Sequence, residues 1–241
     1  MRLLLLGGTA EARALAARLH PHVEVISSLA GRVPDPALPV GEVRIGGFGG
    51  VDGLARWLQD ERVDALVDAT HPFAATITAH AAQACRRLDL PSVVLARPPW
   101  PHGTATVVSS DVQAAEVVAR NGYSRVFLTT GRSGSAAFAA VDAWFLIRAV
   151  TPPEPGALPV RHELVLSRGP YRYDDELRLL REHRIDAVVT KNSGGDMTRA
   201  KLDAAASLGV AVVMVDRPAL PQGVDTVTTV DDAEAWVRAR E

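Results

Sequence analysis

Short apolar runs alternate with alanine-rich amphipathic runs along most of the chain. "RLLLLGG" is followed by "TAEARALAARL", "VDALVDA" by "AATITAHAAQACRRL", and "IDAVVTK" by "TRAKLDAAASLG". Apolar runs without internal alternation are typical of strands buried on both faces, and such strands occur in parallel sheets that helices cover on both sides. The sequence therefore predicts an α/β fold.

The two halves of the sequence resemble each other when one is shifted by about 120 residues. "VDALVDAT" at 63–70 matches "IDAVVTKN" at 185–192, and "VVLARPP" matches "VVMVDRPA" at its Arg-Pro pair. We therefore predict two Rossmann-like half-domains, over residues 1–122 and 123–241, each with a parallel sheet flanked by helices. The alternative is one continuous sheet with coincidental similarity.

Composition excludes several classes of protein. The 241 residues are 47% hydrophobic and 22% charged, with a net charge of -2, so bulk charge does not favour a nucleic-acid partner. The opening apolar run is too short for a signal segment or a membrane span, and we expect a cytoplasmic protein without a membrane partner. Cys85 is the only cysteine, so we expect a buried thiol rather than a reactive one, and no metal centre.

Ligands of open parallel sheets bind beyond the carboxyl ends of the strands, where loops lead into helices. The loops predicted at those ends are candidate binding segments. They are Gly7–Ala12, Ser27–Arg32, Gly46–Gly50, Asp68–Ala74, Thr129–Ser135, Ser167–Tyr171 and Thr190–Thr198.

The first of these loops, "GGTAEA", is a candidate phosphate site. Gly7 and Gly8 would let a phosphate approach the backbone N–H groups at the start of a helix, and Thr9 could add a hydroxyl. The spacing departs from G-x-G-x-x-G, because residue 12 is alanine, and a tight turn is the plain alternative.

The second and third loops bear on cofactor choice. NAD sites usually carry an acid after the second strand, whereas "SSLAGR" has none. If a dinucleotide binds, Ser28 and Arg32 therefore favour the form with a 2'-phosphate, NADP. The alternative is that Arg32 is a solvent-exposed arginine in an arginine-rich protein. "GGFGG", which contains Gly47, indicates either close backbone approach to a ligand or a sharp turn before a helix.

"DATHPFA" places His71 before a proline, which keeps the histidine extended and outside the helix that follows. It could donate a proton or a hydrogen bond to a substrate or to nicotinamide. The alternative is that His71 caps the helix and contacts backbone.

The scarce residues of the chain gather in "TKNSGGDMTRAK". Lysines are two of the 26 basic residues, and both lie here, with one of the two asparagines. Lys191 and Asn192 follow a predicted buried strand, so an ammonium, a carboxamide and several backbone donors converge on one loop. This predicts an anion or cofactor site, with coincidence as the alternative.

With these residues assembled, the chain resembles the precorrin-6A reductase family from end to end. The resemblance depends on motifs that occur in the family's order. These are "LLLLGGTAEAR", "SSLAGR", "GGFGG", "DATHPFA", "LSRGPY" and "VTKNSGGDMTRAKLDAA". It implies NADPH-dependent reduction of a C=C bond in the corrinoid macrocycle precorrin-6A, during cobalamin biosynthesis. It also implies that cofactor and substrate bind in a cleft between two Rossmann-like domains, the N-terminal one holding NADPH.

The resemblance assigns roles to particular residues. The cofactor residues that it implies are Gly7, Gly8, Thr9, Ser28, Arg32, Gly47, Thr70, Asn192, Ser193 and Gly194. Because the substrate carries acetate and propionate carboxylates, cations of the C-terminal half are candidates for binding it. These cations are Arg132, Arg148, Arg168, Arg172 and Lys191. Our hypothesis is that Lys191 stabilises the electron-rich product or a nearby carboxylate, and His71 is a weaker candidate for the proton donor.

Two other functions remain open at this point. One is a different NADPH-dependent reductase on the same scaffold, although no tyrosine has the lysine four positions later that a short-chain dehydrogenase needs. The other is a non-catalytic nucleotide- or anion-binding module. The sequence does not indicate whether the substrate contains cobalt, nor the oligomeric state, for which we favour a monomer.

Overall fold

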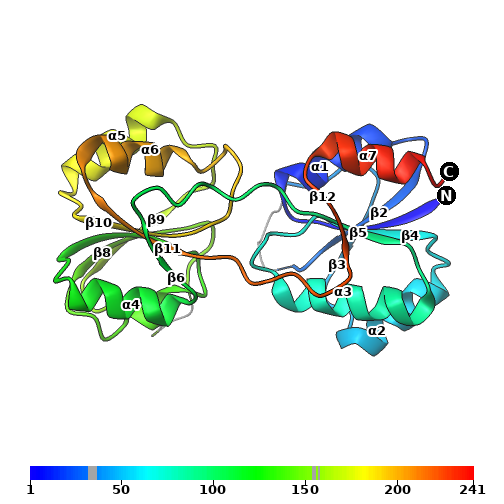
Figure 1. Ribbon diagram of the computed structural model, residues 1–241, viewed down its shortest axis with the longest axis horizontal. Helices are drawn as coiled ribbons and strands as arrows, with labels where there is room; N and C mark the ends of the chain where they lie inside the picture. The colour runs from blue at the N-terminus through cyan, green and yellow to red at the C-terminus, as the bar shows by residue number, and fades with distance from the viewer. Residues whose placement is uncertain (32–36, 154–155, 157) are drawn as a thin grey trace. The chain divides into compact units, whose positions relative to one another are not determined.

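The computed structural model describes residues 1–31, 37–153, 156 and 158–241, which form two compact units (Figure 1). The first unit contains Met1–Pro98 and Pro218–Glu241, and the second contains Pro99–Arg217. Each unit has a six-stranded sheet whose described pairings are all parallel. Helices flank both sheets, which confirms the predicted fold class.

In the first unit the strands lie in the order β12-β5-β4-β1-β2-β3. Its elements are β1 (Arg2–Leu6), α1 (Ala10–Leu19), β2 (Glu24–Leu29), β3 (Glu42–Ile45), α2 (Gly50–Asp60), β4 (Ala65–Asp68), α3 (Ala75–Leu88), β5 (Ser92–Leu95), β12 (Asp225–Val227) and α7 (Val230–Arg238).

Helices α1 and α7 cover one face of this sheet, and α2 and α3 cover the other (Figure 1). Leu3 and Leu5 pack into the core beneath α1 and α7, while Leu4 and Leu6 pack beneath α2 and α3. Successive side chains of a strand point to opposite faces, so both must be apolar when both faces are covered. This explains the uninterrupted leucines of β1.

The second unit repeats this design with the strand order β6-β11-β10-β7-β8-β9. Helices α5 and α6 cover one face and α4 covers the other (Figure 1). Its elements are β6 (Thr106–Val108), α4 (Asp111–Arg120), β7 (Arg125–Thr129), the short 3-10 helix η1 (Ser135–Phe138), β8 (Trp144–Ala149), β9 (His162–Leu166), α5 (Tyr173–Glu182), β10 (Ala187–Lys191), α6 (Ala200–Leu208) and β11 (Ala211–Val215).

The two sheets have the same strand order once β6 and β12 change places. β6 pairs with β11 in the second sheet, and β12 pairs with β5 in the first. The division between units therefore differs from the boundary predicted near Asn121 and Gly122, because β6–α4 precedes that point but belongs to the second unit. The last strand and helix of each sequence half therefore belong to the unit formed by the other half: β6–α4 to the second unit and β12–α7 to the first.

The internal repeat is visible at single residues. The backbone N–H of Arg2 donates to Asp64 Oδ2 at 2.7 Å, and the N–H of Arg125 donates to Asp186 Oδ1 at 3.1 Å. The two contacts are equivalent in the repeat. Asp64 precedes β4 and accepts from the first residue of β1, and Asp186 precedes β10 and accepts from the first residue of β7.

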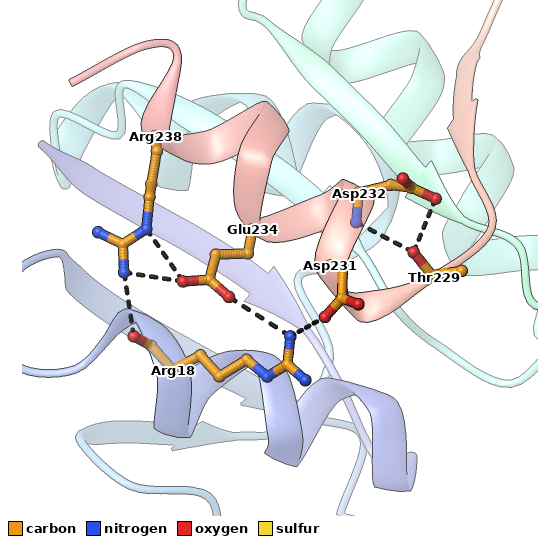
Figure 2. A network of polar contacts seen from close by, with 6 residues as sticks. All are labelled: Arg18, Thr229, Asp231, Asp232, Glu234 and Arg238. Atoms are coloured by element: carbon orange, nitrogen blue, oxygen red, sulfur yellow. Dashed lines mark hydrogen bonds and ion pairs between the residues drawn. The ribbon is translucent and has the colours of Figure 1, made fainter.

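Polar contacts join the exchanged helix α7 to α1 (Figure 2). Arg18 of α1 pairs with Asp231 and with Glu234, while Arg238 donates to Glu234 and to the Arg18 carbonyl. The side chains of Arg18, Asp231 and Arg238 are exposed, and that of Glu234 is partly buried. The packing of α7 comes mainly from Ala233 and Val237, which are fully buried in the core under α1.

Candidate functional site

Each sheet has one point where the strand order reverses: between β1 and β4 in the first unit, and between β7 and β10 in the second. In open α/β sheets ligands bind beyond the carboxyl ends of the strands at such points. The loops after these four strands contain most of the predicted site residues.

The Gly7–Thr9 loop joins β1 to α1. Gly8 has φ +107, a conformation that favours glycine. Thr9 is 8% exposed and caps α1, since its hydroxyl accepts from Ala12 N at 3.1 Å and donates to the Ala69 carbonyl at 2.7 Å. These two bonds give Thr9 a structural role at the start of α1, and its predicted phosphate contact stays a prediction.

Glu11 is the second residue of α1 and pairs with Arg97 at 2.8 Å. Burial raises the pKa of the Glu11 carboxyl, but a hydrogen bond from its own backbone N–H and the Arg97 guanidinium outweigh burial, so the pKa is lowered overall. The positive, N-terminal end of α1 thus already carries the Glu11 carboxylate. A phosphate at this loop would therefore be bound by the backbone N–H groups of the glycines that precede the helix.

Ser28 lies at the carboxyl end of β2, where the side chain of Arg44 from the neighbouring β3 reaches it. Arg44 Nη1 donates to Ser28 Oγ at 3.0 Å, and Nη2 donates to the Gly47 carbonyl at 3.0 Å. The guanidinium lies 3.8 Å above the Phe48 ring. Burial lowers the pKa of Arg44, but an arginine stays charged. These contacts fix one cation at the end of β2.

Arg32 lies outside the described residues. Arg44, which the sequence analysis did not consider, is the guanidinium that the structure places beside Ser28. The parallel register of Ser28 with Arg44 is the signal that could have found it. Arg44 lies within β3 and outside the candidate loops, so loop motifs do not include it.

The "DATHPFA" loop is built around the buried carboxylate of Asp68. Asp68 accepts from Thr70 N at 3.0 Å, from Thr70 Oγ1 at 2.7 Å and from Thr78 Oγ1 at 2.6 Å. His71 is exposed, and its Nδ1 accepts from Phe73 N at 3.2 Å. A neutral His71 therefore carries its proton on Nε2, from which it could donate.

Lys191 ends β10, and its Nζ lies 3.7 Å from Asp111 Oδ2 of α4. The two side chains are 16% and 25% exposed. The structure therefore places the predicted ammonium at the switch point of the second unit, with a carboxylate partner that the sequence analysis did not identify.

Asn192 is fully buried and does not present its carboxamide to a ligand. Its Oδ1 accepts from Trp100 N at 2.8 Å and its Nδ2 donates to the Trp100 carbonyl at 3.2 Å. Arg217 donates to the carbonyls of Asn192 and Ser193, at 2.8 and 3.0 Å. These bonds give Asn192 a structural role, and its predicted cofactor role stays a prediction. Gly194 has φ +66 and forms the turn after it.

Arg148, a predicted substrate contact, is paired with a carboxylate inside the second unit. It is 8% exposed and forms two parallel hydrogen bonds to Glu176 of α5, at 2.9 and 2.7 Å. Its guanidinium lies 4.0 Å from the centre of the Tyr171 ring. A buried, charge-neutralised arginine is not available to a substrate carboxylate.

Lys201, the second lysine, is buried in the same region. Its Nζ donates to the Thr198 carbonyl at 2.6 Å and lies 4.7 Å from the centre of the Trp100 ring. Burial lowers the pKa of Lys201 to about 7, with Glu176 opposing the shift and Arg148 adding to it.

The remaining predicted cations, Arg132, Arg168 and Arg172, are in loops at the carboxyl ends of β7 and β9. Arg168 and Arg172 are exposed and Arg132 is half-buried. Apolar side chains are exposed at this edge of the sheet, at a strand end, in loops or in a first helical turn. These are Val112, Val150, Leu166 and Met197. The edge therefore offers apolar surface together with cations.

Within the described part of the chain, no group of three or more His, Cys, Asp or Glu residues could hold a metal ion. No helix found there is long and apolar enough to cross a membrane.

Comparison with known proteins gives concordant results. The family model described as "Precorrin-6x reductase CbiJ/CobK" matches residues 2–238. A precorrin-6A reductase of Mycobacterium tuberculosis is 72% identical over 236 residues, which cover 98% of this chain and 97% of the relative. One of Rhodococcus erythropolis is 56% identical over 246 residues, with the same coverage. The solved structure of a protein titled "CobK precorrin-6A reductase" has a TM-score of 0.91 and 38% identity, and covers 100% of this chain and 97% of that one.

Proposed function

Because this chain belongs to the precorrin-6x reductase family, we propose that it reduces a C=C bond of precorrin-6A with NADPH, in cobalamin biosynthesis. The observation that carries the proposal is the 72% identity to a precorrin-6A reductase over nearly the whole of both chains. The relatives named cobalt-precorrin-6A reductases are 26–32% identical. This difference supports the cobalt-free macrocycle as substrate.

The first unit is proposed to bind NADPH. Its strand order is that of dinucleotide-binding sheets, with β12 in the sixth position. Gly7 and Gly8 would offer backbone N–H groups to the pyrophosphate, with Gly47 and Thr70 in adjacent loops. Arg44 and Ser28 would hold the 2'-phosphate, since the guanidinium is fixed beside a hydroxyl where NAD sites carry an acid.

The second unit is proposed to bind the macrocycle. A flat ring with acetate and propionate groups needs an apolar surface edged with cations. The carboxyl edge of this sheet has exposed apolar residues, such as Leu166 and Met197, together with Arg132, Arg168 and Arg172. Ser193 and Gly194 would belong to the same loop region.

Reduction of a C=C bond takes one hydride and one proton, and nicotinamide supplies the hydride when bound. Lys191 would stabilise the negative charge that the macrocycle gains. His71 would donate the proton from Nε2, because its Nδ1 is engaged by Phe73 N. Hydride transfer further depends on positioning and on exclusion of water.

The test is single-turnover loss of absorbance at 340 nm with precorrin-6A and either NADPH or NADH. Rapid loss with NADPH and much slower loss with NADH is expected. Binding of NADPH with no loss and an unchanged macrocycle would contradict the reaction while leaving the fold assignment intact.

The roles of Lys191 and His71 are tested separately. Lys191→Met should slow the single-turnover step more than tenfold, and His71→Ala should slow it about 100-fold, a common loss for a general acid. A loss below tenfold for either variant would contradict that residue's role. His102→Ala, at a largely exposed histidine, is the control.

We also propose that the protein acts in the cytoplasm as a monomer. Sedimentation equilibrium at micromolar concentration tests the second point, and a mass twice that of the chain would contradict it.

A further inference from the structure

Asp111 is the first residue of α4, yet its carboxylate is directed at Lys191 and not at its own helix. The start of α4 is already capped, because Ser110 Oγ accepts from Gln113 N at 3.2 Å and Gln113 Oε1 accepts from Ser109 N at 3.0 Å. Asp111 Oδ2 lies 3.7 Å from Lys191 Nζ. The helix therefore does not require an aspartate here.

Within the described ranges, one oxygen of the Asp111 carboxylate is left without a hydrogen-bond partner. Asp111 Oδ1 is buried and has no hydrogen-bond partner among the residues that the structure describes, and the same holds for Thr130 Oγ1. Gly134 lies against both, since a Cβ there would collide with Thr130 Oγ1 and lie 3.0 Å from Asp111 Oδ1. Burying a carboxylate oxygen without a partner costs folding free energy. The contact with Lys191 gives a reason for a carboxylate at this position.

We propose that Asp111 is the positioning residue of Lys191 in the reduction. The inference rests on the proposed function, in which the Lys191 ammonium stabilises charge on the macrocycle. Both side chains are mostly buried, so their attraction is screened less by solvent than that of a surface pair. Asp111 thus fixes the direction of a long, flexible side chain at the carboxyl end of β10, and a fixed charge stabilises developing charge better than a mobile one.

The first experiment does not depend on activity. The chain has only two lysines, so lysine labelled with 13C at Cε gives two ε-methylene signals. In the wild-type protein the two Lys191 ε-protons should have distinct shifts, and in Asp111→Asn the difference between these shifts should become smaller. Lys201 is the internal control, because its hydrogen bond to Thr198 is untouched. Unchanged Lys191 signals would overturn the proposal.

The second experiment separates positioning from a general structural effect. Asp111→Asn should lower the single-turnover rate about tenfold, with little change in the KM for NADPH. In a Lys191→Met background the same change should have less than a twofold effect, because the side chain that Asp111 positions is absent. Equal losses in both backgrounds would overturn the proposal.

Two further variants keep the test interpretable. Asp175→Asn, at an exposed ion pair of α5, should leave the rate unchanged. Asp111→Ser replaces Asp111→Asn if the latter fails to fold, since serine is favoured at helix starts. An inactive wild-type enzyme would contradict the proposed function, whereas the lysine signals would still decide whether Asp111 positions Lys191.

Discussion

The side-chain carboxamide of Asn192 hydrogen-bonds both backbone groups of Trp100, accepting from its N–H and donating to its carbonyl. The Trp100 indole N–H in turn donates to the Gly195 carbonyl at 2.8 Å. Trp100 follows the point where the chain enters the second unit, and Arg217, which precedes its exit, is bound to the carbonyls of Asn192 and Ser193. The loop of scarce residues therefore anchors both connecting segments.

Asn192→Ala should lower the free energy of unfolding by about 1–3 kcal/mol, because the buried Trp100 N–H loses its partner. The affinity for NADPH, measured by fluorescence titration, should change less than threefold. Urea unfolding gives the first quantity, and Asn121→Ala, at an exposed asparagine, is the control. Unchanged stability with a large loss of NADPH affinity would return Asn192 to the cofactor site.

Arg44→Ala should raise the KM for NADPH about 10- to 100-fold, as expected for loss of a charge-assisted hydrogen bond to phosphate. The KM for NADH should change little, because NADH has no 2'-phosphate. Steady-state kinetics with both cofactors measures this change in discrimination. Arg56→Ala, at an exposed arginine of α2, is the control, and equal effects on both cofactors would contradict the assignment.

Lys201 should make stability depend on pH. Burial lowers the pKa of the folded-state lysine to about 7 from the ordinary 10.5, so between these values the unfolded chain binds a proton that the folded chain does not. The free energy of unfolding should therefore rise with pH across this window. Urea unfolding of wild type and Lys201→Met should show a difference, wild type minus variant, that grows from pH 7 toward pH 10.5. Parallel curves would contradict the shift.

The contact between α1 and α7 should depend on packing more than on charge. Val237→Ala should cost about 2 kcal/mol, because Val237 is fully buried in the core of the first unit. Arg18→Ala should leave the Tm nearly unchanged, because its ion pairs are exposed. Amide hydrogen exchange should be faster in β1 and β5 of Val237→Ala, while the strands of the second unit keep their protection. A larger effect from Arg18 than from Val237 would contradict this ranking.

Element types followed directly from the sequence, whereas strand partners did not. Uninterrupted apolar runs identified β1, β4 and β10, because a strand covered on both faces must be apolar at every position. The sequence repeat identified two similar sheets. Periodicity carries no information on which sheet a strand joins, so the exchange of β6 and β12 could not be read from it.

Residue roles were harder to predict than elements. Arg148 looked like a substrate contact because Glu176, which neutralises it, is on a separate helix. Asn192 lies in the predicted loop after β10, but its amide is engaged by Trp100, which is far away in sequence. Arg44 and Asp111 act through neighbours in the sheets, and only strand pairing and the exchanged helix bring them to Ser28 and Lys191.

The exchange of terminal segments fixes the order in which the chain can fold as it leaves the ribosome. Residues 99–217 form an uninterrupted stretch, so the second unit has all its strands before the last segment is synthesised. The first unit, although begun at Met1, must wait for β12 and α7 to complete its sheet and core. Until then β5 is an open sheet edge, and α1 alone covers the face that it later shares with α7. The unit whose strands are synthesised first is therefore completed last.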